Sequence, residues 1–227
     1  METPSLLGVG LYTLADAARL LHVPRRNLLR WLEGYSLAPE GEAGNLVAAN
    51  GERLLTFADL IELKFVALFR REGVSLPTIR VAAQDAVRQF GTAHPFALRK
   101  FHTDGKRLFA TMQQERSREG ASESLLLELA RGQMVIEDVA RPFFRQLEYN
   151  GEEVMLLRPL GPSTCVILDP RRAFGKPIDE ASGVPTRVLY QMVRGGETKE
   201  RVARWHNTDL AGVADAIEFE SSLEKAA

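Results

Sequence analysis

Two short amphipathic helices joined by a tight turn constrain the fold of this chain more than any other feature of its sequence. Residues 12–34 read YTLADAARLLHVPRRNLLRWLEG. Thr13 can cap the first helix, whose apolar face at three-to-four spacing consists of Leu14, Ala17, Ala18 and Leu21. His22 and Val23 form the turn, and Pro24 suits the start of the second helix because its missing N–H would have no partner there. We expect the second helix to direct inward Leu28, Leu29 and Leu32.

The other side of the second helix is basic. It carries no carboxylate before Glu33, and it presents Arg25, Arg26, Asn27 and Arg30. Arginine can chelate guanine, asparagine can chelate adenine, and a helix-turn-helix places the N-terminal end of its second helix in the major groove. A hairpin predicted at Asn50-Gly51 follows at the distance of a wing, where Arg53 could reach the DNA backbone or minor groove. These residues predict a DNA-binding surface.

Overall charge offers that prediction little support. The 227 residues contain 29 Lys and Arg against 30 Asp and Glu, for a net charge of −1, and the two signs are close to balance in each third of the chain. Any nucleic-acid site must therefore be a local patch. The plainer alternative is an amphipathic helical pair whose arginines form a solvated face.

Residues 10–91 resemble the MerR-type winged helix-turn-helix. After the expected wing, TFADLIELKFVALFRREGVSLPTIRVAAQDAV reads as a leucine-rich helix, a Gly-Val-Ser turn and a following helix, with Gly73 and Pro77 separating the two. This is the second helical pair of the family, and the resemblance implies DNA binding. MerR regulators usually continue into a long dimerisation helix, whereas here we expect a β-hairpin after Phe90.

The middle of the chain is predicted to be rich in β-hairpins. Asp104-Gly105 and Asn150-Gly151 each lie between apolar, strand-like runs, and residues 113–124 read as a polar exposed loop. The predicted fold is therefore α+β, with a winged helix-turn-helix in residues 1–91, a β-rich linking segment in residues 92–163 and a small three-helix domain in residues 164–227. We expect the middle segment to hold together a homodimer, because a winged helix alone reads few base pairs.

Three helices are expected near the C terminus, with starts marked by Thr186, Thr198 and Thr208. Their inward faces are expected to contain Val188, Leu189, Met192, Val202, Ala203, Trp205, Leu210, Val213, Ile217 and Phe219. The segment resembles an antitoxin-associated domain through Asp169-Pro170, Gly175-Lys176-Pro177, Val184-Pro185-Thr186 and Gly196-Glu197. The middle stretch HPFALRKFHTDGKRLF is also similar to antitoxins of the VapB type, which join these two end domains.

This resemblance implies an antitoxin whose partner is a PIN-type ribonuclease toxin. Such ribonucleases hold metal ions with clustered carboxylates, so an inhibitor can offer cations to that cleft. The candidate partner-binding residues are Arg187, Arg194, Lys199, Arg201 and Arg204. The alternative is that these cations pair with Glu197 and Glu200 or are solvated.

An enzyme is not expected. The four histidines lack metal-ligand spacing, no phosphate-binding loop is present, and Cys165 lies in an apolar run typical of a small buried side chain. The sequence therefore predicts no catalytic residue, no metal and no cofactor. With no signal peptide and no apolar run long enough to span a membrane, a cytoplasmic protein is expected.

Three hypotheses follow from these patterns. The first is a DNA-binding antitoxin of a type II pair, which represses its own operon and neutralises a PIN-type ribonuclease. The second is a MerR-like transcription regulator without a toxin, whose later domains sense a ligand or a protein. The third is an interaction scaffold whose helix-turn-helix no longer touches DNA.

Overall fold

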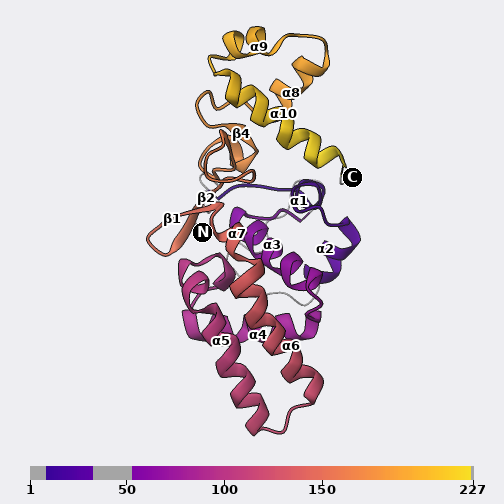
Figure 1. The fold of residues 1–227 in the computed structure, drawn as a ribbon, viewed down its shortest axis with the longest axis vertical. Helices are drawn as coiled ribbons and strands as arrows, with labels where there is room; N and C mark the ends of the chain where they lie inside the picture. Colours follow the sequence, from indigo (N-terminus) through magenta and orange to yellow (C-terminus); the bar gives the residue numbers. More distant parts are fainter. Residues whose placement is uncertain (1–8, 33–52, 226–227) are drawn as a thin grey trace, which may run out of the picture.

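The structure is a computed structural model that describes residues 9–32 and 53–225. It is mainly helical with two small antiparallel hairpins, which confirms the α+β class. Figure 1 shows an elongated molecule in which a C-terminal helical unit lies at one end, a helical hairpin projects at the other, and the N-terminal helices lie between them. No helix in the described ranges is both long and apolar enough to cross a membrane.

The N-terminal helices form where the sequence predicts them, as α1 (Leu14–Leu21), α2 (Arg25–Leu32), α3 (Phe57–Arg71) and α4 (Leu76–Phe90). The start of α3 is fixed by a capping box, in which Thr56 and Asp59 satisfy each other's backbone N–H groups. Ser75 caps α4, and Gly73 takes a left-handed φ of 82° in the turn between the two helices. The predicted hairpin tip at Asn50-Gly51 lies outside the described residues.

The structure differs most from the prediction in the middle segment. The hairpin expected at Asp104-Gly105 is wrong, because both residues lie inside α5 (Arg99–Arg118), a 20-residue helix that follows the short η2 (Pro95–Ala97). The polar loop expected over residues 113–124 is reduced to a turn before α6 (Glu123–Met134). The expectation of no long helix after Phe90 is therefore also wrong. Figure 1 shows α5 and α6 projecting together from the body.

Beyond α6 the chain winds through η3 (Val135–Val139) and α7 (Arg141–Phe144) into strands. The hairpin predicted at Asn150-Gly151 is confirmed by β1 (Leu147–Asn150) and β2 (Glu153–Leu157), where Leu147 pairs with Leu157 and Asn150 with Glu153. A second two-stranded sheet joins β3 (Val166–Ile167) to β4 (Ile178–Asp179), with the short η4 (Ala173–Gly175) between them.

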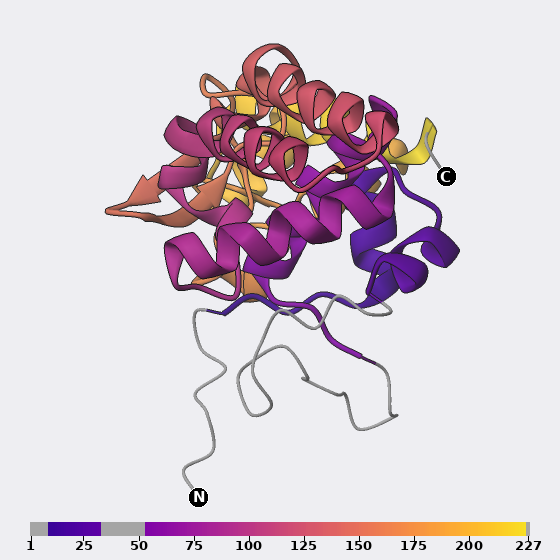
Figure 2. The ribbon, with the colours of Figure 1, turned by 90° about the horizontal axis from the view of Figure 1, so that it is seen from below.

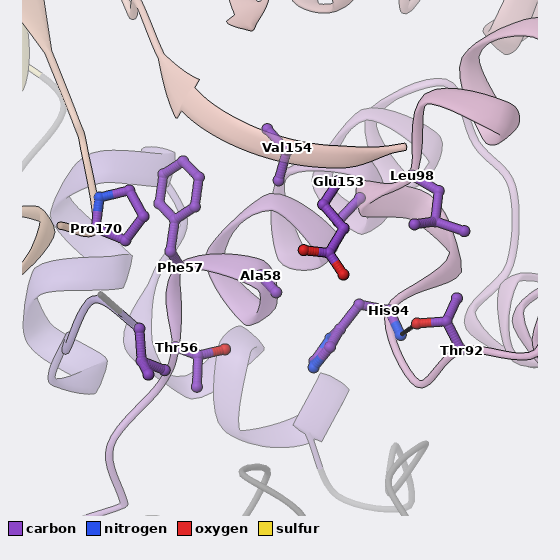
Figure 3. Close-up of a pocket in the computed structure, with 11 residues that line it drawn as sticks. Thr56, Phe57, Ala58, Thr92, His94, Leu98, Glu153, Val154 and Pro170 are labelled. Atoms are coloured by element: carbon purple, nitrogen blue, oxygen red, sulfur yellow. Dashed lines mark hydrogen bonds between the residues drawn. The ribbon is translucent and has the colours of Figure 1, made fainter. Parts of the chain in front are cut away.

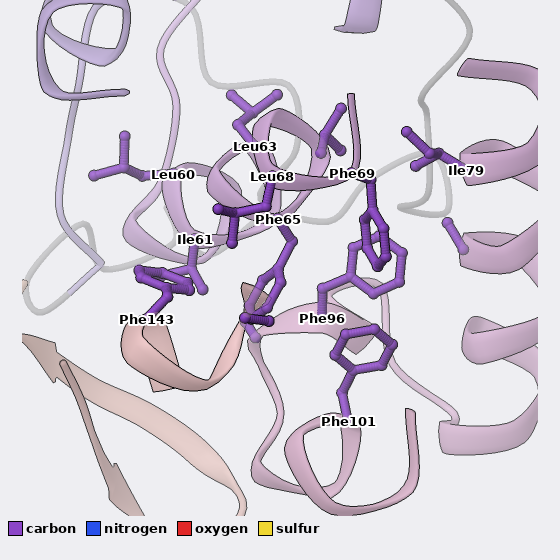
Figure 4. Packing of buried hydrophobic residues seen from close by; sticks show 14 of the residues in the cluster. Leu60, Ile61, Leu63, Phe65, Leu68, Phe69, Ile79, Phe96, Phe101 and Phe143 are labelled. Carbon is purple, nitrogen blue, oxygen red and sulfur yellow. The ribbon is translucent and has the colours of Figure 1, made fainter. Parts of the chain in front are cut away.

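The first and middle segments share one hydrophobic core, which reaches from Tyr12 to Leu168. At its centre, Phe65 of α3 packs edge-on against three rings from other elements, which are Phe96, Phe101 and Phe143 (Figure 4). Figure 2, a view from below, shows α5 and α6 lying side by side across the body. Edge-to-face ring pairs add to the stabilisation from burial, so this cluster joins α3 firmly to the elements that follow.

The three C-terminal helices are confirmed as α8 (Thr186–Arg194), α9 (Lys199–His206) and α10 (Leu210–Lys225). Their own small core contains Leu189, Val202, Ala203, Val213 and Ala216. Four residues expected to face inward are exposed instead, namely Leu29, Val188, Trp205 and Leu210, at 42%, 38%, 54% and 50%. A three-helix unit this small has too few buried positions for all ten residues assigned to its interior. In α2 the buried side is formed by Leu28, Trp31 and Leu32, which leaves Leu29 outside.

Candidate nucleic-acid interface

The first helix of the helix-turn-helix is fixed at both ends by local hydrogen bonds. Thr13 Oγ1 accepts from the Asp16 N–H at 3.1 Å, and an Asp16 carboxylate oxygen accepts from the Thr13 N–H at 3.0 Å. At the other end, His22 takes a left-handed φ of 55°, and the Val23 N–H reaches the Ala18 carbonyl at 3.0 Å. This geometry ends α1 abruptly and allows α2 to begin only a few residues later.

The second helix, α2, has one buried side and one basic side. Leu28, Trp31 and Leu32 are buried, with Leu28 fully excluded from solvent, and they anchor α2 in the shared core. Arg25, Arg26 and Arg30 are exposed, as the sequence predicts. Asp16 is the single acidic residue among residues 12–32, and α2 itself carries no carboxylate.

Asn27 and Leu29 differ from their predicted positions. Asn27 is half-buried at the side of α2, and its Oδ1 accepts a hydrogen bond from Arg30 Nη2 at 3.2 Å. Leu29 lies among the exposed arginines, where an aliphatic side chain can contact a thymine methyl group. The face of α2 thus consists of three arginines and one leucine, and Asn27 supports Arg30 from beside them.

A contact that the sequence did not reveal holds α2 in place. Arg80 of α4 donates from Nη2 to the Arg30 carbonyl at 3.3 Å. The start of α4 is held in turn by Glu128 of α6, which accepts from Ser75 N–H at 2.9 Å and from Thr78 Oγ1 at 2.5 Å. The projecting helical hairpin therefore supports the helix that presents the arginines.

The predicted wing residue Arg53 is half-buried and itself occupies a β-bridge position, two residues before Leu55. Leu55 pairs with Tyr12 through hydrogen bonds of 2.9 and 2.8 Å, which join the residues before α3 to the start of the helix-turn-helix. This pairing fixes where the described chain resumes beside the helix-turn-helix.

The predicted partner-binding residues all lie exposed on the C-terminal unit but do not form one cluster. Arg187 and Arg194 are on α8, and Arg194 pairs with Glu224 at 2.7 Å. Arg201, on α9, pairs with Glu197 at 3.2 Å and also lies 5.3 Å from the Trp205 ring centroid. Trp205, predicted to be core, is thus an exposed aromatic ring beside an arginine, a combination that often anchors protein interfaces.

A polar junction that sequence reasoning missed connects α1 to the C-terminal unit. Glu220 of α10 is almost fully buried, and its carboxylate accepts from Arg19 of α1 at 3.1 Å and from Thr186 of α8 at 2.5 Å. Arg19 and Glu220 are 201 positions apart in the chain, so no local pattern could have paired them. The junction ties the first helix of the helix-turn-helix to two helices of the C-terminal unit.

A cavity of about 300 Å³ lies beside the start of α3, between that helix, η2 and β2 (Figure 3). Thr56 and Phe57 line one side, and Figure 3 shows the Glu153 carboxylate directed from β2 toward His94. His94 Nδ1 also lies 3.8 Å from an Asp59 carboxylate oxygen. Within the part of the chain that the structure describes, no three His, Cys, Asp or Glu residues form a metal-binding group.

Comparison with known proteins agrees with this geometry. Residues 12–86 match the family described as MerR HTH family regulatory protein. The N-terminal unit is a MerR-type helix-turn-helix. This DNA-binding unit covers α1, α2, α3 and most of α4, so the arginines of α2 occupy its second helix.

Two proteins of Mycobacterium tuberculosis strain H37Rv are similar over nearly their whole length. One, named "Putative antitoxin VapB45", is 29% identical over 229 residues, which cover 92% of this chain and 93% of that protein. The other, "Uncharacterized protein Rv2308", is 24% identical over 229 residues, which cover 96% of this chain and 93% of that protein. The crystal structure of Rv2018 from the same species has a TM-score of 0.75 and 24% identity over 93% of this chain and 99% of that one, which shows a shared fold.

Proposed function

We propose that this chain is the DNA-binding antitoxin of a type II toxin–antitoxin pair, which represses its own operon and neutralises a PIN-type ribonuclease. The observation that carries the proposal is the exposed arginine face of α2, presented by a MerR-type helix-turn-helix without an acidic neighbour on that helix. Such a face can contact phosphates and guanine edges in the major groove. The similarity along the whole chain to a protein named as an antitoxin favours the toxin partner.

Binding to DNA is tested with the full chain and a labelled duplex that contains the region upstream of its own gene. Fluorescence anisotropy should show binding that is tighter than to an unrelated duplex of equal length and that weakens as salt increases. Equal affinity for both duplexes would contradict autorepression, while no binding to either would favour the interaction scaffold.

The proposed toxin contact lies on α9, because this helix presents Lys199, Arg201 and Arg204 together with the exposed Trp205 ring. The cations can pair with carboxylates that a PIN-type cleft uses to hold metal ions. The test is co-expression of the neighbouring gene product with the full chain and with an Arg201→Glu/Arg204→Glu variant. We expect wild type to restore growth and the variant to fail.

The control for this test is Arg107→Glu/Arg118→Glu, which reverses two exposed arginines of α5. This variant should still restore growth. If the α9 variant also restores growth at an equal expression level, α9 is not the neutralising surface. If the wild-type chain itself fails to neutralise the product, the regulator without a toxin becomes the better account.

We propose a homodimer formed through the middle segment, as the sequence predicts, but through helices rather than strands. Leu127 and Met134 lie seven residues apart on α6 and are 60% and 62% exposed. This spacing places them on one helical face, and a second copy can cover both side chains by C2 pairing. Light scattering should give a dimer mass for wild type and a smaller mass for Leu127→Glu/Met134→Glu. A monomeric wild type would contradict the proposal.

One observation favours the regulator as a second candidate. Cavities of about 300 and 460 Å³ open on α3, the helix that connects the DNA-binding helices to the rest of the molecule. Both fall within or near the volume range of small-molecule sites. A ligand that changes DNA affinity in the absence of any toxin would support this candidate.

A further inference from the structure

A cavity of about 460 Å³ lies directly beneath the second helix of the helix-turn-helix. One wall comes from the turn and α2, and the opposite wall from the C-terminal half of α3. Its apolar surface is formed by Val23, Pro24, Trp31, Ala67 and Leu68. An apolar cavity with a few polar groups at its edge is the usual form of a small-molecule site.

The polar groups of this cavity are basic or neutral. Lys64 and Arg71 reach it from α3, and His22 and Asn27 reach it from the helix-turn-helix. Among the described residues that line it, none carries a carboxylate. Arg71 does pair with Glu72 at 3.3 Å, but Glu72 is not part of the cavity wall.

Lys64 is the residue with the least compensation for its charge. It is half-buried, and no ion pair or hydrogen bond to it is found in residues 9–32 and 53–225. Its ammonium lies 5.9 Å from the centroid of the Phe143 ring. It also lines a second hollow, formed with Phe143, Leu160 and Phe219, that adjoins the first through Leu21 and His22.

Neighbouring positive charges increase this imbalance. Burial, and to a smaller degree the charge of Arg71, lowers the pKa of Lys64. Burial and the charge of Lys64 likewise lower the pKa of His22. Lys64 is the half-buried cation of the three, whereas His22 and Arg71 are exposed. A cation that is partly removed from water without a counter-charge is unfavourable, and an anion beside Lys64 relieves its desolvation and its repulsion from Arg71.

We propose that the cavity between α2 and α3 binds a small organic anion with an apolar or aromatic body, and that Lys64 is its charged anchor. The anionic head lies among Lys64, Arg71 and His22, and the body packs against Trp31 and Leu68. A carboxylate or sulfonate has the charge and the acceptor oxygens that an ammonium and a guanidinium require.

Occupation of this cavity bears on α2 itself. Asn27 of α2 lines the cavity, and its side chain also accepts the 3.2 Å hydrogen bond from Arg30. A ligand that packs against Trp31 and Asn27 therefore touches the same helix that presents Arg25 and Arg26. The binding site does not depend on the proposed function, because its ligand can be detected without DNA and without a toxin.

The test uses 8-anilinonaphthalene-1-sulfonate, an aromatic sulfonate, with the full chain. The chain has two tryptophans, so in a Trp205→Phe background Trp31 is the sole tryptophan that can transfer energy to the bound dye. We expect saturable transfer with one dye per chain. In the same background, Lys64→Met should weaken dye binding by about tenfold or more, because it removes the charge. Methionine keeps a side chain of similar length and shape. Lys64→Arg should retain binding, and Lys176→Met, at an exposed lysine outside the cavity, should bind as the parent does.

Competition keeps the test decisive if Lys64→Met fails to fold by circular dichroism. On the Trp205→Phe chain, naphthalene-1-sulfonate should displace the dye, and neutral 1-methylnaphthalene should do so at least about tenfold less well. Equal displacement by the two would overturn the requirement for an anion. Displacement by an unrelated DNA duplex as effective as by naphthalene-1-sulfonate would make the cavity a phosphate contact and overturn the small-molecule site.

Discussion

At the scale of single residues, caps were predictable and long-range contacts were not. Thr13 at the start of α1 follows from a local pattern, and the structure confirms it. In the sequence, Gly175 stands out only as part of the Gly175-Lys176-Pro177 motif. In the structure it has a φ of 80°, and its carbonyl accepts a hydrogen bond of 2.7 Å from the buried Tyr12 hydroxyl, 163 residues away. A sequence pattern contains no information on such a pair until the fold brings it together.

Replacement of Tyr12 by phenylalanine should destabilise the protein. The Gly175 carbonyl would lose its partner in a buried position, at a cost of about 1–3 kcal/mol in the free energy of unfolding. Urea unfolding of wild type and Tyr12→Phe measures this difference. Tyr190→Phe is the control, since the Tyr190 hydroxyl contacts Glu224 at an exposed site and should contribute much less. Equal losses for the two variants would contradict this role of Tyr12.

The ion pairs of Arg158 predict how stability depends on pH. Arg158 donates two hydrogen bonds to Glu180, both of 2.7 Å, and these lower the pKa of Glu180 below its ordinary value of 4.5. A carboxyl with a lowered pKa in the folded state stabilises the fold above its unfolded pKa, and this contribution is lost as the pH falls through the folded value. An Arg158→Met variant should therefore be less stable than wild type at about pH 7.

The difference between Arg158→Met and wild type should shrink on acidification below the ordinary pKa of Glu180, because wild type then loses the same interaction. Urea unfolding of both proteins at several pH values between about 7 and 3 tests the sign. A difference that stays constant, or grows, as the pH falls would show that the stabilisation does not come from the ionised carboxylate.

At the scale of elements, the helices of the two ends were predictable and the middle was not. Asp104-Gly105 has the composition of a hairpin turn, yet a Cβ at Gly105 would lie 3.2 Å from the Phe101 ring. A Cβ at Gly132 of α6 would lie closer still to a ring, 2.5 Å from that of Phe109. In these two helices glycine permits close packing against buried rings, and this use is indistinguishable from a turn in a single sequence.

Replacement of Gly132 by alanine has two opposing effects on stability, one from helix propensity and one from packing. Alanine favours a helix over glycine by about 1 kcal/mol. Here the new Cβ would overlap the fully buried Phe109 ring, and overpacking of this kind costs about 1–3 kcal/mol. We expect Gly132→Ala to lower the free energy of unfolding in a urea titration. An increase in stability would mean that α5 and α6 are not packed as closely as the structure has them.

At the scale of the whole molecule, the Arg19–Glu220–Thr186 junction joins the DNA-binding helices to the C-terminal unit. Both units were recognisable from the sequence, but their contact was not, because it depends on a buried carboxylate whose partners come from both ends of the chain. The junction offers a path by which a partner on α8 or α9 could affect α1.

Glu220→Gln should weaken that junction. The amide keeps the size of the side chain but lacks the charge that Arg19 pairs with, so the buried interaction becomes weaker and the unfolding midpoint should fall. Thermal unfolding, compared with Glu224→Gln at an exposed carboxylate, gives the size of the effect. A Glu220→Gln protein as stable as wild type would mean that the charge of Glu220 does not help to hold the two units together.

The salt dependence of DNA binding tests the central claim most directly. Anisotropy titrations between about 50 and 200 mM NaCl, with the duplex from upstream of the gene, compare wild type with Arg25→Ala/Arg26→Ala, and Arg107→Ala/Arg118→Ala is the control. If α2 reads DNA, the double variant loses about tenfold or more in affinity and its log–log salt slope falls by about 1 for each phosphate contact removed, while the control matches wild type. Unchanged affinity and slope in the Arg25→Ala/Arg26→Ala chain would contradict the assignment of DNA binding to α2.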